Sequence, residues 1–156
     1  MSEKKKAIIA EIEAARRSLI DLVQNLDAES LALPTCCEGW SVKDILAHLS
    51  AGEAGLLQRA RNAANGESTV PAPGFNLNQH NQERIEQRRD WSVTQLVAEM
   101  NQNRAETLKF METVPEEHLD RMGQLGPRQL TAGQIIAHIA HHEIEHAEHI
   151  RTAFSR

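Results

Sequence analysis

The spacing of the apolar residues constrains the fold of this chain more than any other feature. Apolar residues recur three and four positions apart over nearly the whole sequence, and no stretch shows sustained alternation with β-branched residues. Such a spacing places apolar side chains on one face of a helix, whereas a strand with one exposed side alternates. The sequence therefore predicts an all-α fold.

The apolar stretches, and the glycine- and proline-containing segments that separate them, predict four main helices. We expect them over about residues 3–26, 41–64, 75–114 and from 131 almost to the C-terminus. The third is expected to break near residues 90–92 into a short polar helix and a core helix. The connections between the helices contain glycine and proline, which favour irregular structure. Such long connections predict a four-helix bundle that is not simply up-down-up-down.

Three helix starts are marked by capping residues. Ser41 is followed three positions later by Asp44, a pair that resembles a capping box. Ser92 and Thr131 stand at the expected starts of two further helices, where a hydroxyl can accept from a free backbone N–H.

Length and charge narrow the class of protein. The chain has 156 residues, 40% of them hydrophobic, which suits one domain spanning residues 1–156 with its own core. Its formal net charge is -5, with lysine and arginine scattered among acidic residues, so we expect no nucleic-acid partner.

No run of 18 apolar residues occurs, and the only two cysteines are adjacent. We therefore expect a cytoplasmic protein without a membrane span or a structural disulfide.

Histidine is the unusual residue of this chain. Five of the eight histidines lie between His138 and His149. In the last helix His142 and His146 fall on the edge of the apolar face, one turn apart, and His48 lies at the margin of the apolar face of the second helix. A histidine pair of this spacing plus a third imidazole from a facing helix can hold a metal and leave a fourth position open.

Other readings of the histidines stay open. His138 and His149 lie further toward solvent and can support the ligands or substitute for them, while His141 points away from the apolar face. A histidine-rich helix end can equally be polar surface. Two histidines at the H-x-x-x-H spacing, taken alone, more often lie on such a surface than bind a metal. We assign His80 and His118 to solvent.

Three further residues have open roles. Glu53 falls near the middle of an apolar helix face, where a carboxylate needs a partner. It can pair with an arginine, hydrogen-bond a ligand histidine or act as a base, and pairing is favoured. Cys36 and Cys37 precede the second helix, whose N-terminus would stabilise a thiolate. Loop packing is the favoured role of both cysteines.

The residues match a known pattern. Residues 34–49, PTCCEGWSVKDILAHL, resemble the second-helix signature of the DinB-like superfamily, with Gly39-Trp40, Asp44 and His48 at its spacing. Residues 142–150 resemble the last helix of that superfamily. The likeness covers about residues 5–154 and is greatest to the branch of mycothiol-dependent maleylpyruvate isomerase. No segment resembles the C-terminal domain of these isomerases.

The resemblance implies a four-helix bundle of the up-up-down-down type, frequently a homodimer. It implies a divalent metal, with zinc or nickel most typical, bound by His48, His142 and His146. Known activities in the superfamily include transfer and isomerisation with low-molecular-weight thiols such as mycothiol.

Three functional hypotheses follow. The first is a thiol-dependent transferase or isomerase for a small electrophilic substrate, with Glu53 or His149 moving a proton. The second is a metal-dependent small-molecule binding or stress protein without catalysis. The third is a dimeric bundle with histidines on its surface.

Overall fold

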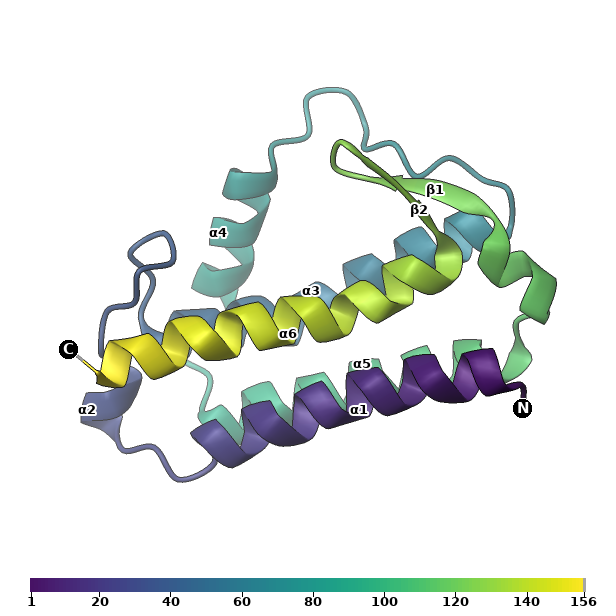
Figure 1. Cartoon of the computed structure of the whole chain (residues 1–156). Helices are drawn as coiled ribbons and strands as arrows, with labels where there is room; N and C mark the ends of the chain where they lie inside the picture. The colour runs from purple at the N-terminus through teal and green to yellow at the C-terminus, as the bar shows by residue number, and fades with distance from the viewer. Residues whose placement is uncertain (156) are drawn as a thin grey trace.

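Four long helices carry the apolar stripes of the sequence. In the computed structural model, which describes residues 1–155, they are α1 (Glu3–Val23), α3 (Val42–Ala64), α5 (Val93–Thr113) and α6 (Ala132–Phe154). Two short helices, α2 (Ala28–Leu31) and α4 (Leu77–Gln87), lie in the connections (Figure 1). The predicted all-α bundle is confirmed, with the first helix ending at residue 23 rather than 26.

The predicted caps fix three of the long helices. Ser41 and Asp44 form a capping box at the start of α3. Ser92 caps α5 and Thr131 caps α6, and each completes a box with a glutamine three residues later. Each box satisfies backbone N–H groups that the first turn of a helix leaves free.

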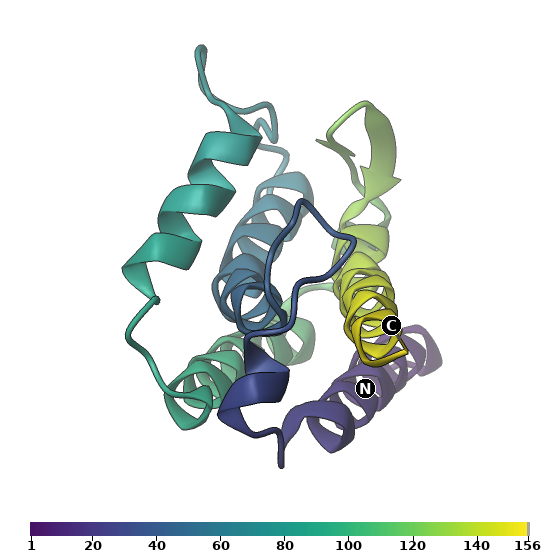
Figure 2. The same ribbon diagram turned by 90° about the vertical axis from the view of Figure 1, so that its left-hand side faces the viewer.

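The helix directions follow from the long crossover. Helices α1 and α6 run one way and α3 and α5 the other, and the crossover from α3 to α5 passes through α4 (Figure 1). The bundle thus contains the two parallel helix pairs of the up-up-down-down type. In chain order, however, the four long helices point up, down, down and up. Figure 2, an end-on view, shows α6 beside both α1 and α3, and α4 outside the bundle against α3.

The second connection contains more structure than the sequence indicates. A short 3₁₀ helix (Glu116–Asp120) precedes the antiparallel strands β1 (Met122–Leu125) and β2 (Arg128–Thr131). Four-residue strands are too short for alternation to be recognised. The hairpin packs on α3 so closely that a Cβ on Gly123 would lie 2.9 Å from the Cβ of Ala63.

A charged layer divides the core into two apolar clusters. Arg16, Glu53, Arg104 and Glu143 come from α1, α3, α5 and α6, and each lies between the stretches of its helix that supply the two clusters. These four residues are at most 7% exposed, and the arginines pair with the carboxylates. None of the helices within residues 1–155 combines the length and the apolar character needed to span a membrane.

Candidate metal centre

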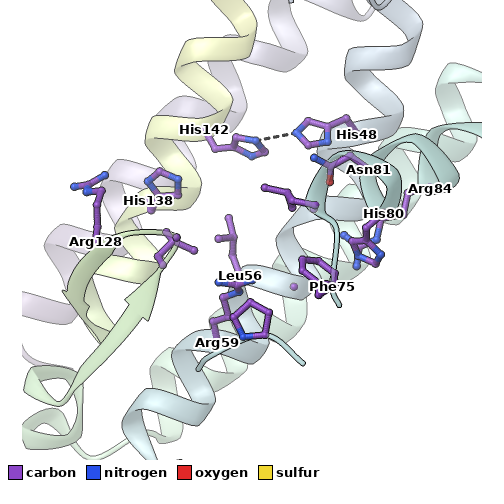
Figure 3. A pocket seen from close by; sticks show the side chains of 16 residues that line it. His48, Leu56, Arg59, Phe75, His80, Asn81, Arg84, Arg128, His138 and His142 are labelled. Carbon is purple, nitrogen blue, oxygen red and sulfur yellow. Dashed lines mark hydrogen bonds between the residues drawn. The ribbon is translucent and has the colours of Figure 1, made fainter. Parts of the chain in front are cut away.

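Three imidazoles from two helices meet at one point. Nε2 of His48 on α3 lies 2.9 Å from Nε2 of His142 on α6, which lies 3.1 Å from Nε2 of His146. The two helices are antiparallel neighbours, so the margins of their apolar faces lie against each other. The sequence places these histidines on those margins, and Figure 3 shows His48 facing His142. The three side chains are therefore brought together and not splayed apart.

The donor atoms fit a divalent cation. Three nitrogens that each lie 2.0–2.1 Å from a tetrahedral metal are separated by about 3.3 Å. The two observed separations of 2.9 and 3.1 Å are close to this value. An imidazole Nε2 either donates one proton or accepts on one lone pair, so His142 cannot form full hydrogen bonds with both neighbours. A cation that accepts all three lone pairs removes this conflict.

Burial keeps the three imidazoles neutral. His48 and His146 are only 9% and 6% exposed. Burial, and secondly the nearby imidazole of another member of the cluster, lowers the pKa of each of the three histidines to about 3. At neutral pH all three are therefore unprotonated at one nitrogen and can act as ligands.

The other ring nitrogen of His146 has its own neighbours. Its Nδ1 lies 3.3 Å from Nδ1 of His149, one turn further along α6, and 3.9 Å from Sγ of Cys37. Burial raises the pKa of the Cys37 thiol, and Glu38 and Cys36 raise it further. Cys37 is therefore a neutral thiol next to the cluster, and Cys36 is exposed. His149 is placed where it can orient His146.

Glu53 is not part of the histidine cluster. Its Oε1 accepts from Arg104 Nε at 2.8 Å and from Thr107 Oγ1 at 2.9 Å, and its Oε2 accepts from Arg16 Nη2 at 2.9 Å. Of the three roles that the sequence left open for Glu53, arginine pairing is the one that these contacts support. Arg16, Arg104 and Glu143 were not predicted from the sequence, although charged residues within apolar stripes are a recognisable signal.

A cavity of about 520 Å³ opens beside the histidines. It lies between α3, α4, the hairpin and α6, with His48 and His142 at one end (Figure 3). Its wall includes His138, whose ring stacks on that of His142 with centroids 6.2 Å apart. His80, which we expected in solvent, is half-buried and lines this cavity from α4. This part of the cavity wall could not be predicted from the sequence, because α4 carries few apolar residues.

The chain matches a family model over most of its length. A model described as the DinB superfamily matches residues 11–150. No curated protein sequence matches this chain.

Several solved structures share the fold. A mycothiol-dependent maleylpyruvate isomerase superposes with a TM-score of 0.76 at 13% identity over 96% of this chain, which spans only 63% of the isomerase. YfiT from Bacillus subtilis, described as a probable metal-dependent hydrolase with an unusual four-helix bundle topology, has a TM-score of 0.78 at 15% identity, covering 98% of this chain and 87% of YfiT. The colibactin self-resistance protein ClbS, solved with double-stranded DNA, has a TM-score of 0.72 at 19% identity, covering 97% of this chain and 96% of ClbS. The absence of a nucleic-acid partner therefore stays a prediction from charge.

Proposed function

This chain belongs to the DinB superfamily, and on that premise we propose that it binds a divalent cation through His48, His142 and His146 and uses it on a small electrophilic substrate. The convergence of three Nε2 atoms within hydrogen-bonding distance carries this proposal. Three protein ligands leave a coordination position for a further molecule, whereas structural zinc sites have four. Imidazole ligands suit zinc or nickel.

The reaction that fits best is thiol-dependent transfer or isomerisation. A divalent cation supplies Lewis-acid chemistry that lowers the pKa of a thiol or water in the open position. The isomerase with a similar fold is described as dependent on mycothiol, which supports a low-molecular-weight thiol as co-substrate here. The cavity of about 520 Å³ is within the usual range for small-molecule sites.

The protein's own groups have distinct roles in this proposal. His149 contacts the ring of His146 through the two Nδ1 atoms, and we propose that it orients this ligand and exchanges a proton during the reaction. Glu53 has no part in the proton transfer because its oxygens are engaged in the core. The apolar part of the cavity wall would limit the access of water to the nucleophile once a substrate fills the cavity.

A second candidate function is metal-dependent binding of a small molecule without turnover. The observation that favours it is the shared fold with ClbS, a protein described by self-resistance rather than by a reaction. The same three histidines and the same cavity would serve it. Incubation with electrophiles and several thiols separates the two functions, because a sequestering protein gives stoichiometric protection and an enzyme gives turnover.

Metal analysis of untagged protein tests the proposal. We expect about one zinc or nickel ion per chain, and a large loss of metal in His142→Ala. His141→Ala is the matched control, because His141 is the adjacent histidine but its side chain is 68% exposed. Equal metal content in the two variants, or wild-type protein that is indifferent to added zinc and nickel, would contradict the proposal.

Cobalt-substituted protein tests thiol activation. Added thiol is expected to change the visible spectrum, since a sulfur ligand in the open position alters the electronic transitions of the ion. An unchanged spectrum would argue against thiol activation but not against metal binding. The homodimer and the cytoplasmic location follow from the resemblance and composition only, and sedimentation analysis tests the former.

A further inference from the structure

The cavity beside the histidines is basic, although the protein is acidic. Arg59, Arg84 and Arg128 line it, together with two histidines outside the metal cluster. No aspartate or glutamate is among its lining residues. The whole chain carries a formal net charge of -5, so this positive lining is not a general property of the surface.

The lining arginines lack carboxylate partners. None of the three forms an ion pair with any residue within 1–155, whereas the core arginines Arg16 and Arg104 each pair with buried glutamates. Arg84 is half-buried and makes one hydrogen bond, from Nη1 to the backbone oxygen of Ala51 at 3.2 Å. A guanidinium has five N–H donors, so Arg84 keeps unused donors in a partly desolvated position.

Most of the rest of the wall is apolar. Leu56, Phe75 and Leu77 also line the cavity, and Figure 3 shows Arg59 and Phe75 at the end remote from His48 and His142. Arg84 lies against α3 at Gly55, where a Cβ would be in ordinary van der Waals contact with Nη1 of Arg84, at 3.8 Å. Arg59 on α3 and Arg84 on α4 thus face a common space from two sides.

We propose that this cavity selects amphiphilic anions: a carboxylate or phosphate pairs with Arg59 and Arg84 while an apolar body packs on Leu56 and Phe75. This inference deepens the proposed function, on which it rests for the position of the reacting group at the histidine end. Guanidinium groups pair with carboxylate and phosphate through two parallel hydrogen bonds, which favours such groups over neutral polar ones. The substrate class is therefore a small apolar molecule with an anionic end.

Calorimetric titration with three matched probes tests the charge preference. The probes are 3-phenylpropionate, phenyl phosphate and the neutral 3-phenylpropanamide. We expect at least one anion to bind about tenfold more tightly than the amide at low salt, because charge-assisted hydrogen bonds exceed neutral ones. The two anions distinguish a carboxylate site from a phosphate site. Equal binding of all three probes would overturn the proposal.

Arginine variants locate the binding. Arg59→Met and Arg84→Met are each expected to weaken binding of the preferred anion about tenfold and to leave amide binding unchanged. Arg61→Met on α3 and Arg89→Met, just after α4, are the controls, because both arginines lie outside the cavity lining and pair with surface glutamates. An equal loss in the control variants would mean that net charge alone acts, which would overturn the proposal.

Titration before and after chelation separates this inference from the proposed function. Anion binding that survives chelation and depends on Arg59 and Arg84 supports the inference even if the protein holds no metal. Anion binding that disappears on chelation and ignores both arginine variants would place the anion on the metal, and would overturn the inference while supporting the metal site.

Discussion

Replacing Glu53 by glutamine should cost about 3–5 kcal/mol of unfolding free energy, the usual loss when one partner of a buried ion pair is removed. Glu53 is 3% exposed and accepts three hydrogen bonds from Arg16, Arg104 and Thr107. Glutamine keeps the size of the side chain but leaves two buried guanidinium groups with Glu143 as their only other buried carboxylate. Burial already raises the pKa of Glu143.

Urea unfolding followed by circular dichroism measures this loss. Glu13→Gln is the control, because Glu13 pairs with Arg104 at 2.7 Å but its side chain is 38% exposed, and such pairs contribute about 0–1 kcal/mol. Thr107→Val is a milder variant that removes one donor to Glu53 and should cost about 1–3 kcal/mol. A loss below about 1 kcal/mol in Glu53→Gln would refute the reasoning. So would a folded Glu53→Gln protein that lost its metal selectively, since Glu53 would then serve the histidine site.

Three further predictions concern packing, capping and pH. Gly123→Ala should cost about 1–3 kcal/mol, measured by thermal unfolding, because the new Cβ would lie 2.9 Å from Ala63 on α3; unchanged stability would show that the hairpin moves freely. Ser92→Ala should cost about 1 kcal/mol and Ser92→Thr much less, since only alanine removes the acceptor for Gln95 N–H. Metal-free protein should lose stability as the pH falls from 6.5 toward 3, because the unfolded chain then binds protons that the three buried imidazoles resist. Melting temperatures between pH 7 and 5 test this, and His142→Ala should show a smaller decline.

The helices could be predicted from sequence because their signals are local. The capping pair Ser41 and Asp44 and the apolar stripe that follows fix the start of α3 to the residue. The same periodicity places His48 and the His142–His146 pair on the margins of their faces, so that two facing helices suffice to bring them together.

The remaining features depend on contacts between distant parts of the chain. Arg16 and Arg104, the partners of Glu53, lie 37 and 51 residues away in sequence. They lie on other helices, and the apolar periodicity gives the rotation of each helix about its own axis only approximately. The hairpin has too few residues for a pattern and is held by its close packing on α3. The cavity wall formed by α4 has no apolar stripe, since Ile85 is its only buried residue.

The charged layer also fixes how far each long helix can slide along its neighbours. A shift of α6 by one turn would move Glu143 by about 5.4 Å, out of reach of both arginines, and apolar side chains would replace it. His142 is the adjacent residue and would move with it, away from a nitrogen that now lies 2.9 Å distant. The longitudinal alignment of the three imidazoles is thus locked by ion pairs in which no histidine takes part.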